Sequence, residues 1–73
     1  MREFGIREGE EFIRLGQLLK AAALVSSGVE AKAEILSGEV SVNGEACEMR
    51  GKKLHPGDVV RFRGEEIRIV DGP

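Results

Sequence analysis

The chain has 73 residues and a net charge of −2, with 11 Lys and Arg against 13 Asp and Glu. This length allows one domain and leaves no room for a second core. Cys47 is the only cysteine and His55 the only histidine, which excludes an internal disulfide and a zinc site built from such ligands. No apolar run approaches the roughly 20 residues of a membrane span, and the chain does not begin with an apolar signal core. We therefore expect one cytoplasmic domain over residues 1–73, with no metal and no cofactor.

Positive charge is concentrated in the middle of the sequence. Residues 14–53 hold six Lys and Arg against five Glu, whereas the flanking segments 1–13 and 54–73 are both net negative. The negative total argues against non-specific attraction to nucleic acid. The central cations form a basic patch only if folding gathers them on one side of the molecule.

The first third of the chain predicts short strands and then a helix. Phe4 and Ile6 alternate with polar neighbours, and Phe12 begins a similar pattern, so one or two strands are expected around residues 8–10. Apolar residues then recur three, four and seven positions apart, which predicts a helix over 15–24.

A second helix is expected after a Ser-Ser-Gly turn. Ser27, with Glu30 three residues later, fits a capping box and predicts a helix over 28–37. Gly38 is expected to end it in a left-handed backbone conformation. Lys32 falls within the apolar side of this helix, where its side chain either extends to water or borders a cleft between the helices that faces a ligand.

Turn residues divide the second half of the chain into strands. Asn43-Gly44 suits the positive φ angles of a type I′ hairpin, and Pro56-Gly57-Asp58 marks another turn. The strands are predicted over 39–42, 45–49, 59–63 and 66–70. Together these elements predict an α+β fold, in which two helices pack on a small, mostly antiparallel sheet.

The sequence contains no recognisable catalytic arrangement. Nucleophilic catalysis needs Ser or Cys beside a base, and the only histidine lies in a predicted turn. No glycine cluster followed by Lys and Ser or Thr forms a phosphate loop. Cys47 is expected to be a small core residue, and His55 either a turn residue or a donor to RNA. We therefore expect a protein that is not an enzyme.

Basic residues are the remaining candidates for function. Arg50, Lys52 and Lys53 follow the hairpin, either as solvated loop charges or as a clamp on phosphates, whose neutralisation dominates affinity for nucleic acids. Lys20 lies on the polar face of the first helix. Arg14, at the start of that helix, serves either in packing and ion pairing or in binding.

Two turns are further candidates. The N–H groups of the Ser26-Ser27-Gly28 turn open a helix and would suit a phosphate, although Ser27 is first of all a cap. Asn43 is likewise first a hairpin residue, and any contact with RNA is an additional role.

The order of these pieces resembles the S-four-like RNA-binding domain, also called the alpha-L motif and first known from a small-subunit ribosomal protein. The matching stretches lie within residues 14–60 and read R-L-G-Q-L-L-K, S-S-G-V-E-A-K, G-E-V-S-V-N-G-E and R-G-K-K-L-H-P-G-D. The last stretch resembles the stand-alone bacterial members, of the YaaA/YbcJ kind. Gly16 stands where many members carry Asp, and Gly28 stands where many carry Arg, which removes one cation.

The resemblance implies a basic face, formed by the two helices and the hairpin, that binds folded ribosomal or transfer RNA in ribosome assembly or translation. The residues implied in binding are Arg14, Lys20, Ser26, Ser27, Gly28, Lys32, Asn43, Arg50, Lys52 and Lys53. The expected partners of this monomer are RNA and the ribosome. Two other classes stay open: a protein-interaction adaptor with the same fold and little RNA affinity, and a unit that acts in trans with an RNA-modifying or aminoacylating enzyme.

The aromatic residues restrict how RNA would be recognised. Phe4, Phe12 and Phe62 all have strand patterns that point to the core, so no exposed ring is expected to stack on unpaired bases. The protein is therefore predicted to recognise the backbone shape and phosphate spacing of folded RNA.

Overall fold

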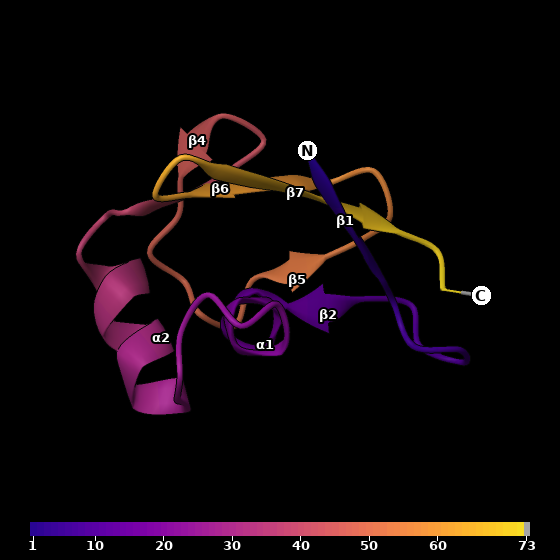
Figure 1. Cartoon of the computed structure of the whole chain (residues 1–73), viewed down its shortest axis with the longest axis horizontal. Coiled ribbons are helices and arrows are strands. Elements are labelled where there is room, and N and C mark those ends of the chain that lie inside the picture. Colours follow the sequence, from indigo (N-terminus) through magenta and orange to yellow (C-terminus); the bar gives the residue numbers. More distant parts are fainter. Residues whose placement is uncertain (73) are drawn as a thin grey trace.

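The structure is a computed structural model that describes residues 1–72. The helices are α1 (Leu15–Ala21) and α2 (Gly28–Leu36), and the strands are β1 (Arg2–Gly5), β2 (Ile13–Arg14), β3 (Val40–Val42), β4 (Glu45–Ala46), β5 (Lys53–Leu54), β6 (Val59–Phe62) and β7 (Glu65–Val70). Figure 1 shows both helices on one side of the larger sheet. The predicted α+β fold, with two helices on a mostly antiparallel sheet, is confirmed.

The larger sheet has five strands in the order β1-β7-β6-β3-β4. Its inner pairs are antiparallel, but β1 lies parallel to β7, with Arg2 opposite Ile67. The N-terminal strand therefore covers the edge of a sheet formed by the second half of the chain. A separate two-stranded ladder pairs β2 with β5 and leads directly into α1.

One face of the larger sheet packs against the helices. Along β6 and β7 the buried residues alternate with exposed ones, as expected for a sheet with one solvated face. The residues buried in the core are Ile6, Leu15, Leu18, Leu19, Ala22, Val25, Ala31, Ile35, Val40, Val42, Leu54, Val60, Phe62, Ile67 and Ile69. Val40 and Val42 of β3 both point into this core, with exposures of 0% and 7%.

The first helix ends three residues before its predicted end. Ala23 has a φ of 60°. The N–H of Leu24 donates to the carbonyl of Leu19 over 2.9 Å, and the N–H of Ala23 donates to the carbonyl of Lys20 over 3.1 Å. These bonds form a Schellman motif, which is normally closed by glycine. The alanine run gave no stop signal, but burial of Val25 requires the chain to turn back here.

The predicted turns are largely confirmed. Gly38 has a φ of 85°, and Asn43-Gly44 has φ angles of 52° and 86°, as a type I′ hairpin requires. The β6–β7 turn lies at Arg63-Gly64, one residue earlier than expected. The predicted strand 45–49 is reduced to β4, and β5 was not predicted.

Candidate functional site

The turn at residues 49–52 is attached to the start of α1 through its backbone. The first two N–H groups of α1 donate to the carbonyl oxygens of Lys52 and Arg50, both over 2.9 Å. Arg14, just before the helix, donates from its guanidinium to the carbonyl of Gly51 over 3.1 Å. Because the turn directs its carbonyls at the helix, the first two N–H groups of α1 are satisfied, and the cationic side chains of the turn remain exposed.

A cleft of about 310 Å³ lies between α1, the start of α2 and this turn. It is lined by Arg14 and Lys20 around α1, by Gly28 and Ala31 of α2, and by Arg50 of the turn. We call it the basic cleft, because three cations line it and none of its described lining residues is acidic. Four of the ten predicted binding residues, Arg14, Lys20, Gly28 and Arg50, thus meet in one concavity.

Two further predicted cations lie beside the same turn, outside the basic cleft. Lys52 lines a second hollow, of about 300 Å³, together with Asn43 and Met49. The Lys53 ammonium lies 5.0 Å from the centroid of the Phe12 ring.

Lys32 is exposed on α2. The expected apolar side of this helix is not a buried face, because α2 buries only Ala31 and Ile35, whereas Val29 is 81% exposed and Leu36 is 56% exposed. That expectation was wrong because the apolar side of α2 is wider than the area that packs against the core, so part of it faces solvent. Lys32 follows Gly28 by four residues, so it lies on the same side of the helix as the basic cleft.

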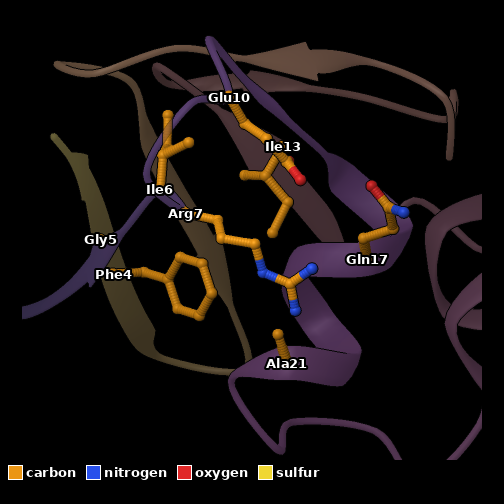
Figure 2. Close-up of a pocket in the computed structure, with 8 residues that line it drawn as sticks. All are labelled: Phe4, Gly5, Ile6, Arg7, Glu10, Ile13, Gln17 and Ala21. Atoms are coloured by element: carbon orange, nitrogen blue, oxygen red, sulfur yellow. The ribbon is translucent and has the colours of Figure 1, made fainter. Parts of the chain in front are cut away.

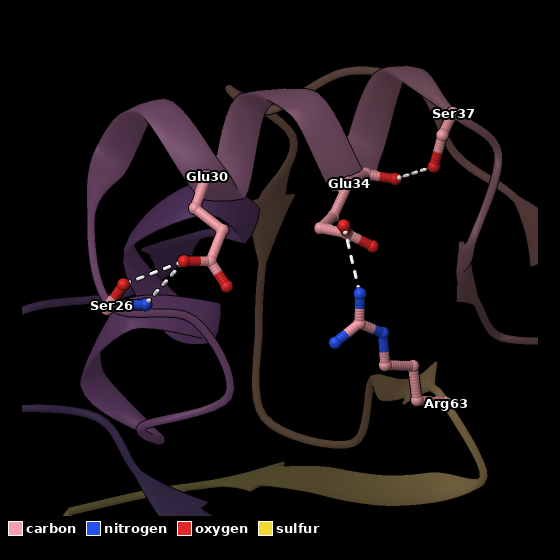
Figure 3. A network of polar contacts seen from close by, with 5 residues as sticks. All are labelled: Ser26, Glu30, Glu34, Ser37 and Arg63. Carbon is pink, nitrogen blue, oxygen red and sulfur yellow. Dashed lines mark hydrogen bonds and ion pairs between the residues drawn. The ribbon is translucent and has the colours of Figure 1, made fainter.

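The Glu30 carboxylate of α2 binds Ser26 in the turn that precedes the helix. The Ser27 hydroxyl accepts from the N–H of Glu30 over 3.2 Å, which confirms the predicted cap. The Glu30 carboxylate accepts from the Ser26 hydroxyl over 2.7 Å and from its N–H over 3.4 Å, and these bonds hold the pKa of Glu30 below its ordinary value (Figure 3). Glu34 farther along α2 pairs with Arg63 over 3.0 Å. The Ser26 donors expected to face a phosphate are therefore engaged within the protein.

Asn43 has a structural role that the sequence reasoning missed. Its side-chain amide donates to Asp58 over 3.0 Å, and its carbonyl oxygen accepts from the N–H of Val59 over 2.9 Å. Asp58 also accepts from the N–H of His55 over 2.8 Å. Burial raises the pKa of Asp58, but the bonds from His55 and Asn43 outweigh it and leave the pKa below its ordinary value. These bonds fix the β3–β4 hairpin to the Pro-Gly-Asp turn. The aspartate of that turn is the sequence feature from which the contact could have been predicted.

The prediction that all three phenylalanines face the core is wrong for Phe12. Phe62 is buried and Phe4 packs partly buried against the core, but Phe12 is half-buried outside it. Arg14 and Lys53 lie over its ring at 5.5 and 5.0 Å from the centroid, distances typical of cation–π contacts. Strand alternation alone could not show that the two-stranded ladder turns this side chain away from the core.

A third hollow, of about 370 Å³, opens on the other flank of α1. Figure 2 shows the Arg7 guanidinium reaching into it between Phe4 and Ala21, with Ile6 and Ile13 on its wall. Of the ten predicted binding residues, all of which the structure describes, none lines this hollow.

The described part of the chain offers no group of three His, Cys, Asp or Glu side chains suited to a metal ion. Neither helix within residues 1–72 has the length and apolar character needed to span a membrane.

Comparisons with known proteins agree with this architecture. Residues 4–70 match the family model of the S4 domain. The solution structure of YbcJ from E. coli, described as revealing an alpha-L motif involved in RNA binding, superposes with a TM-score of 0.70 and 30% identity, covering 96% of this chain and 87% of that one.

A curated relative is also similar in sequence. The probable ribosome maturation protein RlbA of Bacillus subtilis (strain 168) is 48% identical over 54 residues, which are 74% of this chain and 76% of that protein. The family match covers the second half of β1 and all of the other eight elements, and the two-helix unit is the one that the sequence motifs predicted. The chain therefore belongs to the S4 domain family.

Proposed function

We propose that this protein is a non-enzymatic RNA-binding protein that binds folded ribosomal RNA through the basic cleft during ribosome maturation. The observation that carries this proposal is the cleft itself, where Arg14, Lys20 and Arg50 line a concavity without an acidic lining residue among those described. The RNA-binding alpha-L motif described for YbcJ and the ribosome maturation role described for RlbA support RNA and the ribosome as partners. We expect the protein to act as a cytoplasmic monomer with one domain.

The charge distribution determines how such binding would work. With a net charge of −2, the whole molecule does not attract RNA at long range. Attraction must come from the local field of the cleft, and cations that neutralise phosphates release counterions. Binding should therefore depend strongly on salt concentration and on the few cations that line the cleft, with Lys32, Lys52 and Lys53 extending the contact.

Crosslinking in cells, followed by sequencing of the bound RNA, identifies the target. We expect enrichment of defined segments of ribosomal RNA over transfer RNA. Recovery of background RNA alone would contradict the proposal and favour the protein-interaction adaptor.

A salt titration tests the role of the cleft. If about four to six phosphates are contacted, the log–log slope of affinity for a transcribed ribosomal RNA stem-loop against salt should be roughly −3 to −5. The double substitution Lys20→Ala/Arg50→Ala should weaken binding and flatten this slope by about one to two.

The matched control is Arg61→Ala/Arg68→Ala, which removes the same charge. Both arginines are exposed and alternate with buried residues, so they lie on the sheet face opposite the helices. This control should bind nearly as the parent does. Equal losses of RNA affinity for the two double substitutions, or a salt slope near zero for the parent, would contradict binding through the cleft.

A further inference from the structure

The two-stranded β2–β5 ladder has one face that belongs to the core and one that does not. Ile13 pairs with Leu54, and Leu54 is fully buried. Arg14 pairs with Lys53 at the next position. Because side chains alternate across a strand, Phe12 lies on the same side as Arg14, two residues away.

The same alternation places His55 beside Lys53 on that outer face. Extending the antiparallel register by one position beyond Ile13 and Leu54 places Phe12 opposite His55. Their ring centroids are 6.0 Å apart, with an interplanar angle of 51°. We call Phe12, Arg14, Lys53 and His55 the aromatic–cationic face. It contains two rings and two cations.

The charges on this face are not balanced within the protein. Arg14 and Lys53 both lie within 5.5 Å of the centroid of one ring, and neither makes an ion pair within residues 1–72. Cation–π contacts explain how the two cations are positioned, but like charges at such proximity favour an incoming anion.

Arg14 joins this face to the basic cleft. It lines the cleft, donates to the turn at Gly51 and contacts the Phe12 ring. RNA bound in the cleft would therefore continue onto the aromatic–cationic face. Exposed rings next to cations are the usual means by which proteins hold unpaired bases, with the ring stacked on the base and the cations on adjacent phosphates.

We propose that Phe12 and His55 form a stacking site for one unpaired base of the bound RNA. Arg14 and Lys53 hold the phosphates that flank this base. The inference rests on the proposed RNA-binding function and adds recognition of an unpaired base to it. His55, which is exposed, supplies the outer ring, and the half-buried Phe12 supports it from the protein side.

The test uses two RNA stem-loops that differ only in their bases. One carries unpaired adenines in its loop, and the other carries abasic nucleotides at the same positions, so both present the same phosphates. The parent protein should bind the adenine loop about five- to 150-fold more tightly, as expected for one stacked base.

Substitutions then assign this preference to the two rings. Phe12→Leu and His55→Ala should each reduce the preference for the adenine loop, and His55→Ala should leave the salt slope unchanged. Phe12→Tyr, which keeps an aromatic ring, should retain the preference. Phe12 lies outside the core, so Phe12→Leu should fold, and an unchanged thermal midpoint checks this.

The two proposals fail in different ways. If the parent binds both loops equally, or if Phe12→Leu keeps the full preference, the stacking site is overturned and RNA binding by the cleft stands. If the parent binds neither loop at low salt, the proposed function is overturned, and the stacking site with it.

Discussion

Gly28 lines the basic cleft without contributing a side chain to it. A Cβ atom built at Gly28 meets no other atom within 4 Å, and the residue is the first of α2, with helical backbone geometry. The position therefore has space for a longer side chain.

The first prediction is that Gly28→Arg increases RNA affinity. One added phosphate contact should steepen the log–log salt slope by about one and tighten binding by roughly three- to tenfold in dilute salt. Fluorescence anisotropy with a ribosomal RNA stem-loop measures both quantities. The control is Ala33→Arg, which adds the same charge to an exposed residue of α2 outside the cleft. Equal gains from both substitutions would show that net charge, and not the cleft, determines affinity.

The second prediction concerns the end of α1. Ala23 adopts a φ of 60°, a conformation that disfavours side chains with a Cβ atom. Ala23→Gly should raise the free energy of unfolding by about 0.5–1 kcal/mol, because relief of this strain exceeds the added entropy of the unfolded chain. Urea denaturation measures the change.

The matched control for this substitution is Ala33→Gly. Ala33 is an exposed residue within α2, where the same replacement should lower the free energy of unfolding by about 1 kcal/mol. Destabilisation by both substitutions would contradict the assignment of strain to Ala23.

At the scale of elements, the β3–β4 hairpin is held in place by Asp58. This carboxylate accepts from the Asn43 amide and the His55 N–H, and its pKa lies below the ordinary value of about 3.9. A lowered pKa means that the folded state favours the charged form. The stability that Asp58 contributes is therefore fully present above pH ~4 and is lost as the pH falls through the folded-state pKa.

The third prediction follows from this link. Asp58→Asn should lower the free energy of unfolding at pH 7 by about 1 kcal/mol, and the difference from the parent should shrink below pH ~4, where the parent carboxylate is protonated. Urea denaturation between pH 7 and pH 2.5 measures it. Asp71→Asn, at an exposed position outside the strands, is the control and should follow the parent. A difference that is constant with pH would mean that the carboxylate charge has no part in the link.

Elements whose signals are local were predictable from the sequence. The cap at Ser27, the glycine end at Gly38 and the Asn43-Gly44 hairpin all occur as expected, because neighbouring residues determine them. The pairing of β2 with β5 joins residues about 40 positions apart and has no local signal. The exposure of Phe12 depends on that pairing, so it could not be predicted either.

At the scale of the molecule, the acidic net charge and the basic cleft coexist because folding separates the charges. Arg14, Lys20 and Arg50 come from two segments about 30 residues apart and meet because the 49–52 turn bonds to the start of α1 through its backbone. Sequence reasoning identified these cations by type and by the family motif. It could not foresee that Ser26 and Asn43 use their polar groups within the protein, since those partners depend on tertiary geometry.

The most direct test of the central claim is an NMR titration of the ¹⁵N-labelled protein with a ribosomal RNA stem-loop. The largest amide shift changes are expected in residues 14–20, 28–32 and 50–53, which surround the basic cleft, with small changes over 61–68, in strands and a turn that do not line the cleft. Alanine at both Lys20 and Arg50 should reduce the changes in all three segments together. Shifts that centre on 61–68, or a spectrum that does not respond to RNA at low salt, would contradict the account.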